Sequence, residues 1–295
     1  PAPEIRHLWK DFRPDVVHLQ DHYPLCRSAL AIALERGLPV VASNYFLPGN
    51  MTRQFPKILR RAWTERLLWD SVLAVMNQVQ VVTTPTKTAA HILIEQGLKK
   101  RLMVISCGVD LQEFRQDDTV DRAKLRKRYG LAPDLPTLLY VGRLDPDKSV
   151  DVPIKAMRLL GEQPVQLGIA GRGTHERQLQ RLAHKLGVDD GRVIFTGYVH
   201  SQDLAPLLNS VDGFIMPSEV ETQSLATLEA LATGRPAIVP DAGAVQELVQ
   251  DGVNGYLYQH NKPETCAHAI AHWLANREHW EEMGATSLAI GQQHG

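Results

Sequence analysis

The chain has 295 residues, 44% of them hydrophobic and 22% charged, which is ordinary for a globular protein and enough for two domains. Its 32 basic and 33 acidic residues give a net charge of −1, so there is no overall attraction to nucleic acid. Three widely spaced cysteines fit buried thiols in a reducing compartment better than a disulfide framework or a metal site. No apolar run reaches the length of a membrane-spanning helix and no signal peptide is visible, so we expect a cytoplasmic protein.

Short β-branched runs alternate with amphipathic stretches along the chain, the pattern of parallel sheets covered by helices. Because the chain begins at Pro1 and stops soon after a helical stretch, we expect a fragment trimmed at both ends. The first part has predicted strands at 15–19, 39–43, 79–83 and 102–106.

A polar segment over 112–128 predicts a domain boundary near Phe114. We therefore expect a partial N-terminal domain at 1–113, a linker at 114–135 and a C-terminal domain at 136–295. Alternation in the last domain predicts an open doubly wound α/β sheet. Its expected strands lie at 137–141, 165–170, 192–195, 213–216, 236–239 and 256–258.

Two glutamates, Glu221 and Glu229, flank the start of a predicted helix in MPSEVETQSLATLE. Eight residues of one helix would separate them by about 12 Å, so we expect Glu221 in the loop and a helix start near Ser224. Thr222 and Ser224 are both candidates for the helix cap, and the first amides would then face an anion. By spacing alone, two exposed carboxylates would be the commoner explanation.

Arg143 and Lys148 flank an Asp-Pro turn after a buried strand that ends at Gly142, in TLLYVGRLDPDKSVD. Arginine binds two phosphate oxygens at once and lysine adds a point charge, so the pair suits a diphosphate. Two solvated loop cations are an equally good explanation in isolation.

Two further strand ends carry glycines. In GIAGRGTHERQL, a dinucleotide-binding fingerprint would require a third glycine where Glu176 stands, so Gly171 and Gly173 are expected to allow a tight turn and close approach of a ligand. In VIFTGYV, Thr196 and Gly197 follow a strand where backbone atoms would meet a flat base.

Taken in order, VGRLDPDK, IAGRG, FTGYV, MPSEVE, LEALATGRPAIV, DAGAVQELV and DGVNGYLY resemble the C-terminal domain of the retaining glycosyltransferases of family 4 over roughly 136–260. The resemblance implies the GT-B fold, with two facing Rossmann-like domains of which the first is truncated here. It also implies a hexosyltransferase that moves a sugar from a UDP- or GDP-sugar to a hydroxyl acceptor, with neither a metal nor an organic cofactor. Thr-Gln-Ser between the glutamates is similar to a subgroup that glycosylates diacylglycerol or other lipids.

The resemblance also implies residue roles. Arg143 and Lys148 would bind the donor diphosphate, Glu221 the donor sugar and Glu229 the ribose, with catalysis resting on Glu221, Arg143 and Lys148. The implied donor-binding residues are Gly142, Arg143, Lys148, Gly171, Gly173, Thr196, Gly197, Glu221, Ser224, Leu225 and Glu229.

The N-terminal part has one departure from the family pattern. SNYFLPGN resembles a loop that carries a histidine facing the transferred sugar, and Tyr45 takes that catalytic position here. A tyrosine donates a hydrogen bond but, with a pKa near 10, is no base at neutral pH. His22 at a neighbouring strand end is a second candidate, although a lone histidine there is more often a polar rim residue.

A basic, aromatic-bearing helix expected within 53–69 would suit peripheral contact with the inner face of a membrane, and thus a lipid acceptor. A helix that covers the sheet, with solvated arginines, is the favoured explanation. Two other functions stay open: a nucleotide-sugar-binding protein without transfer activity, and a sugar-nucleotide epimerase or hydrolase. The latter would require histidine–carboxylate pairs, for which His22 is the one loose candidate.

Overall fold

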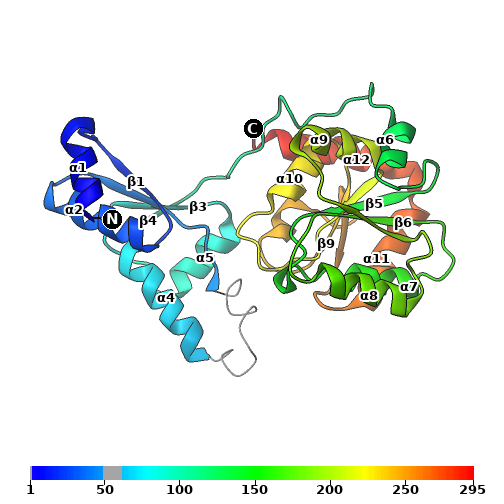
Figure 1. Ribbon diagram of the computed structural model, residues 1–295, viewed down its shortest axis with the longest axis horizontal. Coiled ribbons are helices and arrows are strands. Elements are labelled where there is room, and N and C mark those ends of the chain that lie inside the picture. Colours follow the sequence, from blue (N-terminus) through cyan, green and yellow to red (C-terminus); the bar gives the residue numbers. More distant parts are fainter. Residues whose placement is uncertain (1, 49–61) are drawn as a thin grey trace. The chain divides into compact units, whose positions relative to one another are not determined.

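The computed structural model describes residues 2–48 and 62–295, and the chain divides into two compact units, 1–106 and 107–295 (Figure 1). The boundary lies seven residues before the expected end of the first domain at 113. Residues 114–135, expected as a linker, belong to the second unit, where α6 (Arg122–Arg128) packs against α9 (Ser201–Ser210).

The first unit is a four-stranded parallel sheet with the strands in chain order. All four predicted strands are present, with bounds within two residues of expectation. The strands are β1 (Val17–Gln20), β2 (Val40–Ser43), β3 (Val81–Thr84) and β4 (Arg101–Val104), and the helices are α1 (Ala2–Phe12), α2 (Pro24–Glu35), α4 (Ala62–Met76) and α5 (Lys87–Glu95).

One face of this sheet packs into a core with α2, α4 and α5. Trp69 and Val72 of α4 are buried in that core, while Trp63 and Leu67 on the same helix are exposed. The described part of the helix expected within 53–69 therefore packs as a sheet cover. Residues 53–61, which carry most of its basic side chains, lie outside the described residues.

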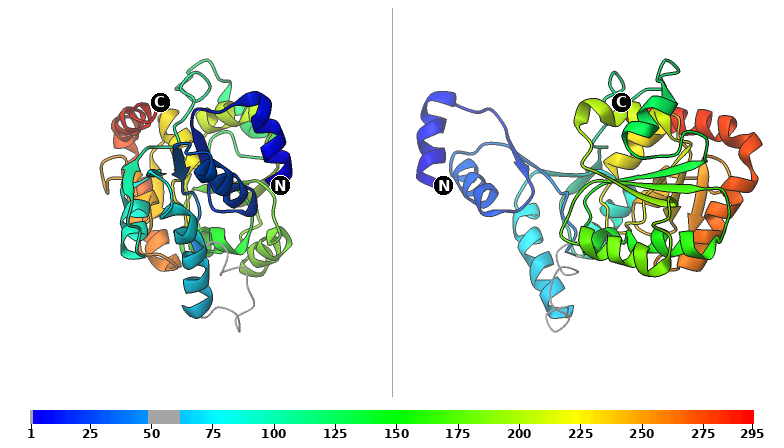
Figure 2. Two further views of the ribbon diagram at one scale, coloured as in Figure 1. Left: turned by 90° about the vertical axis from the view of Figure 1, so that its left-hand side faces the viewer. Right: turned by 45° about the vertical axis from the view of Figure 1, so that its right-hand side comes forward.

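The second unit is a six-stranded, all-parallel sheet between two layers of helices, with α7, α8 and α11 on one side and α9, α10 and α12 on the other (Figures 1 and 2). All six predicted strands are present. The strands are β5 (Thr137–Val141), β6 (Gln166–Ala170), β7 (Val193–Gly197), β8 (Gly213–Ile215), β9 (Ala237–Pro240) and β10 (Gly255–Tyr258). The helices are α7 (Asp151–Leu159), α8 (Glu176–Leu186), α10 (Leu225–Ala232), α11 (Pro263–Ala275) and α12 (Trp280–Gln292). Three short 3-10 turns also occur in the described part of this unit: η2 (Pro146–Lys148), η3 (Val245–Leu248) and η4 (Arg277–His279).

The strand order of the second sheet is β10-β9-β8-β5-β6-β7. From the central strand β5, the chain adds β6 and β7 on one side of the sheet. It then returns to the other side of β5 and adds β8, β9 and β10 there. Where such a sheet reverses, the loops at the carboxyl ends of the two central strands diverge and leave a crevice that binds ligands. In this unit the crevice lies between the loops that follow β5 and β8.

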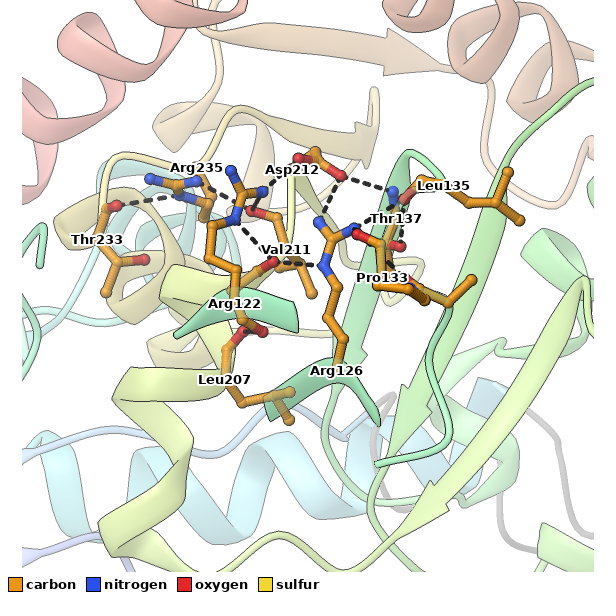
Figure 3. Close-up of polar contacts among 12 residues, drawn as sticks. Arg122, Arg126, Pro133, Leu135, Thr137, Leu207, Val211, Asp212, Thr233 and Arg235 are labelled. Atoms are coloured by element: carbon orange, nitrogen blue, oxygen red, sulfur yellow. Dashed lines mark hydrogen bonds and ion pairs between the residues drawn. The ribbon is translucent and has the colours of Figure 1, made fainter. Parts of the chain in front are cut away.

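At the opposite, amino-terminal edge, buried charges fasten the first residues of the unit to the sheet (Figure 3). The Arg126 guanidinium donates to the carbonyl oxygens of Ser210 at 2.6 Å and Leu135 at 2.9 Å, and to Asp212 Oδ2 at 2.7 Å. Asp212 in turn accepts from the amide of Thr137, the first residue of β5, at 2.9 Å. This network makes the expected linker an integral part of the second unit.

The cysteines are all free, but only Cys266 is fully buried. Cys26 is half-buried and Cys107 is exposed, so the prediction of three buried thiols was wrong for these two. Within residues 2–48 and 62–295, no helix is long and apolar enough to cross a membrane.

Candidate functional site

The loops after β5, β6 and β7 are joined to one another through their backbones. The amide of Leu144 donates to the carbonyl of Arg172 at 2.9 Å, and the amide of Gly171 donates to the carbonyl of Gly197 at 2.8 Å. Three strand ends thus form one rigid floor at the carboxyl edge of the sheet.

Two glycines make this close contact possible. A Cβ on Gly171, whose φ is 137°, would lie 1.9 Å from the carbonyl oxygen of Gly142, and one on Gly173 would lie 2.4 Å from the backbone of Leu144. These glycines are therefore needed for the close approach of the neighbouring protein loop. Gly197, with φ of 74°, has no described atom within 4 Å of a Cβ position, so the space beside it is open.

A mainly apolar cavity of about 410 Å³ lies on this floor. Gly142, Arg143 and Gly171 of the predicted donor site line it, and Tyr198 forms part of its wall with an exposed ring. The hydroxyl of Thr196 is used elsewhere, because it donates to the carbonyl of Ile169 at 3.3 Å. The cavity is lined by Val141, Gly142, Arg143, Ala170, Gly171, Arg172, Tyr198, Val199, Ser201 and Leu204.

The two predicted cations are both paired with carboxylates. Lys148 Nζ lies 2.7 Å from Glu221 Oε1 and 3.6 Å from Asp147 Oδ2, with the Lys148 and Glu221 side chains only 14% and 17% exposed. Arg143 pairs with Asp145 and lies 3.3 Å from Asp147 Oδ2. Two cations against three carboxylates leave this group of five side chains with a net charge of 2 − 3 = −1. The Lys148–Glu221 pair connects the loop after β5 to the loop after β8, across the sheet reversal.

Asp147 is the center of this group. Its side chain is buried, and Oδ1 has no hydrogen-bond partner among the described residues. Its carbonyl accepts a hydrogen bond from Ser218 Oγ at 3.4 Å, which links the same two loops. A buried carboxylate is costly unless it is paired, so Asp147 holds Lys148 and Arg143 in place.

The loop backbone rests on Tyr140, whose hydroxyl donates to the carbonyl of Arg143 at 2.7 Å. Burial, with smaller contributions from Glu221 and Asp147, raises the pKa of Tyr140 far above its usual value, so this hydroxyl is a permanent donor. At Asp145, burial opposes ionisation, but hydrogen bonds from the amide and hydroxyl of Thr174 outweigh it and lower the pKa. Asp145 is therefore a fixed negative partner for Arg143.

Helix α10 begins as expected. Ser224 is its N-cap and accepts from the Thr227 amide at 3.3 Å, and the first backbone bond runs from Leu228 to the Ser224 carbonyl at 3.0 Å. The amides of Leu225 and Ala226 precede that ladder and have no partner within the helix. They form the positive end of the helix dipole, beside the loop that carries Glu221.

Two families of known proteins match the chain. Residues 121–287 match the family described as Glycosyl transferases group 1, and residues 1–113 match Glycosyltransferase Family 4. The chain belongs to the group 1 glycosyltransferases. The first match covers every residue of the donor site, from Gly142 to Glu229, and the second covers Tyr45.

Two curated relatives and one solved structure illustrate the family. The chain is 34% identical over 298 residues to the D-inositol 3-phosphate glycosyltransferase of Xylanimonas cellulosilytica, covering 95% of this chain and 68% of that one. It is 28% identical over 255 residues to the alpha-monoglucosyldiacylglycerol synthase of Streptococcus pneumoniae, covering 84% and 57%. Its fold matches Anabaena HepE, solved with UDP and glucose, with a TM-score of 0.83, 19% identity and coverage of 98% of this chain and 76% of that one.

The two parallel-sheet α/β units of the chain are the domains of the GT-B glycosyltransferase fold. The chain spans only 54% to 68% of the length of the curated relatives that it matches.

Glu229 lies in the second turn of α10 and is half-buried. Burial, helped by the negative charge of Glu113, raises its pKa to about 7. A carboxyl group that is neutral at mildly acidic pH and ionised above neutrality suits a hydrogen-bonding role toward a hydroxyl-bearing ligand. The spacing in the sequence gave no sign of this shift.

Several site residues escaped sequence reasoning. Asp145 and Asp147 were taken as parts of a turn, although the alternation of charge in RLDPDK is a signal for mutual pairing. Glu219 lies two residues before Glu221 and pairs with His260 at 2.8 Å. This pair connects the loop after β8 to the segment that follows β10.

No cluster of three or more His, Cys, Asp or Glu side chains in the described part of the chain is arranged to hold a metal ion.

The two candidate residues of the first unit, Tyr45 and His22, differ in their exposure to solvent. Tyr45 is 40% exposed in the loop after β2. His22, for which the sequence left open a site role or a place at the polar rim, is buried two residues after the end of β1.

We predict that Gly171→Ala will lower the free energy of unfolding by about 3 kcal/mol or more, because the new methyl group meets a backbone carbonyl that cannot move without breaking the floor. Gly187→Ala is the matched control, with φ of 64° and no atom within 4 Å of the Cβ position, and it should cost only about 1 kcal/mol. Urea unfolding followed by circular dichroism measures both. Equal losses in the two variants would contradict the proposed contact.

We predict that Glu229→Gln will stabilise the protein above pH 7 and leave it unchanged near pH 4.5. Since the folded-state pKa is raised from 4.5 to about 7, the stabilising contribution of Glu229 is fully present below pH 4.5 and is lost as the pH rises through 7. The gain above pH 7 should be roughly 2 kcal/mol, because partial exposure reduces the full linkage value. Denaturant unfolding at a series of pH values tests this, with the exposed Glu162→Gln as control. A pH-independent difference would show that Glu229 ionises normally.

Proposed function

We propose that the protein transfers a sugar from a nucleoside-diphosphate sugar to a hydroxyl acceptor, with retention of configuration at the anomeric carbon. The observation that carries this proposal is the position of the Lys148–Glu221 pair, at the reversal of the second sheet and beside the start of α10. There a cation for phosphate and an acceptor for sugar hydroxyls lie in direct contact.

The pairing suggests how a donor binds. The group of five charged side chains carries a net charge of −1, so a diphosphate must take over Lys148 and Arg143 from their carboxylates. When Lys148 turns to the phosphate, Glu221 loses its partner and its oxygens become free to accept hydrogen bonds from the sugar. The amides of Leu225 and Ala226, which have no partner within the helix, supply further donors to phosphate oxygens at the helix start.

The cavity of about 410 Å³ beside Arg143 is the proposed place of the base. Its walls are mainly apolar, with Tyr198 offering a ring face and Gly197 leaving room for close backbone contact. Anabaena HepE, which has the same fold, was solved with UDP, and this supports UDP as the first nucleotide to test and GDP as the second.

In the transfer step, the bond between the anomeric carbon and the donor phosphate oxygen breaks, and a bond to the acceptor oxygen forms on the same face of the sugar. The acceptor hydroxyl gives its proton to the departing diphosphate. Arg143, Lys148 and the start of α10 stabilise the negative charge that develops on this leaving group. This division of roles requires no metal ion and no organic cofactor.

A lipid is the proposed acceptor class. The relative named alpha-monoglucosyldiacylglycerol synthase and the Thr-Gln-Ser sequence between the glutamates support it, as do exposed Trp63 and Leu67 for contact with a membrane surface. Tyr45 remains the proposed hydrogen-bond donor on the acceptor side.

We predict that Lys148→Met will weaken UDP binding by about 10- to 100-fold, since a charge-assisted bond is lost and Glu221 and Asp147 are left to repel the phosphate. Isothermal titration calorimetry with UDP and GDP measures the affinity. Release of UDP or GDP from the corresponding nucleotide sugar, with diacylglycerol vesicles or inositol phosphate present, measures transfer.

Lys155→Met is the matched control, because Lys155 is a half-exposed lysine on α7 that pairs with Asp151. It should bind UDP as the wild type does. Equal affinity in the Lys148 and Lys155 variants would contradict the proposed donor site. Tight nucleotide binding with no release of nucleotide in any acceptor mixture would favour a binding protein without transfer activity.

A further inference from the structure

A second cavity, of about 350 Å³, lies at the amino-terminal edge of the second sheet, opposite to the donor loops. Its walls come from α6, from the segment just before β5, from Asp212 just before β8, and from Arg277 and Trp280 where η4 meets α12. Cavities of roughly 300 Å³ and more are the size that holds small-molecule ligands. None of the residues that line it belongs to the predicted donor site.

Arginines are concentrated around this cavity. The guanidinium groups of Arg122 and Arg126 both pair with Asp212, at 2.7 Å for Arg126. The Arg235 guanidinium lies beside them and, among the described residues, donates to backbone carbonyls alone (Figure 3). Burial, followed by the positive charge of Arg122, lowers the pKa of Arg235 to about 10, so it is charged at neutral pH. Three guanidinium groups thus lie around one carboxylate.

Two of the arginines that line the cavity keep donors that no described residue uses. Arg122 donates through Nε and Nη2 to backbone carbonyls and to Asp212, so its Nη1 has no partner within the described ranges. Arg277 makes no hydrogen bond or ion pair there, and its Cζ lies 5.7 Å from the center of the Trp280 ring. That ring is fixed in turn, since it stacks on Trp273 at 4.2 Å and Trp280 Nε1 donates to the Trp273 carbonyl at 2.7 Å.

The charge at the cavity favours an anion. Its lining holds three arginines and two aspartates, Asp134 and Asp212, which gives a formal charge of 3 − 2 = +1. Behind the lining, the charges of Arg235 and Asp118 balance each other. Asp212 Oδ2 already accepts from a guanidinium group and from the Thr137 amide at 2.9 Å, and Asp134 is exposed to water. The groups available to a ligand are therefore cationic donors.

We propose that this cavity is a second ligand site, separate from the donor site, for a small molecule that carries a phosphate group. Its phosphate oxygens accept from Arg277 and from Nη1 of Arg122, because the guanidinium fork matches two phosphate oxygens. Pro133, Pro136 and the Trp280 ring form apolar walls for the rest of the molecule. The ligand joins α6 to the start of α12, which packs on α10. The proposal does not depend on the proposed function.

The test titrates the full chain, labelled with ¹⁵N-tryptophan, with phenyl phosphate, a probe that joins a phosphate group to a flat ring. The indole signal of Trp280, assigned through Trp280→Phe, should shift as the probe binds. Signals of Trp9 and Trp63, which belong to the first unit, should not shift.

Arg277→Gln should weaken binding of phenyl phosphate about tenfold, because one charge-assisted hydrogen bond is lost. Arg277 has no hydrogen-bond partner among the described residues, so the fold should be retained. Arg158→Gln is the matched control, since Arg158 is an exposed arginine on α7 whose side chain pairs with no described residue. It should bind the probe as the wild type does, and equal affinity in the two variants would overturn the proposal.

Two further comparisons separate this site from other causes of binding. Lys148→Met disables the proposed donor site, and the probe should still shift the Trp280 signal with unchanged affinity. Loss of the shift in that variant would place the probe in the donor site and overturn the proposal. Benzoate and sodium chloride at equal ionic strength should bind much more weakly or leave the signal in place. An equal shift with either would show that the cavity does not select phosphate, which would also overturn the proposal.

Discussion

The second unit depends on one contact, the ion pair between Lys148 and Glu221. It joins the loop after β5 to the loop after β8, which the strand order sends in opposite directions, and it lies beside buried Asp147. Without a cation, two carboxylates would face each other in a half-buried place, and such charges are costly unless they are paired. The pair therefore keeps the crevice assembled and holds its two functional groups ready for exchange with a ligand.

Other contacts in the second unit fix the backbone of the loops that carry this ion pair. Gly171 and Gly173 let the loop after β6 touch the loop after β5, and Tyr140 supports the Arg143 carbonyl from below. At the far edge of the sheet, Arg126 and Asp212 fasten the segment before β5. The chain thus places the paired charged side chains on a hydrogen-bonded backbone, so that we expect ion pairs to exchange without movement of the sheet.

Much of the architecture was predictable from the sequence because buried parallel strands are continuous apolar runs. TLLYV and the other runs gave all ten strands, and the Ser224 cap followed from a short polar residue before an apolar helix. Partners of charged groups were not predictable in this way. Whether Asp147 meets Lys148, or Glu113 raises the pKa of Glu229, depends on loop geometry that no local pattern encodes.

Hydrogen exchange of the full chain, with and without saturating UDP, tests the central claim most directly. If the donor binds at the sheet reversal, amides in 142–148 and 221–228 should exchange more slowly with UDP, while those in 122–135 at the opposite edge should be unchanged. Protection that spares both strand-end loops and appears elsewhere would contradict the account.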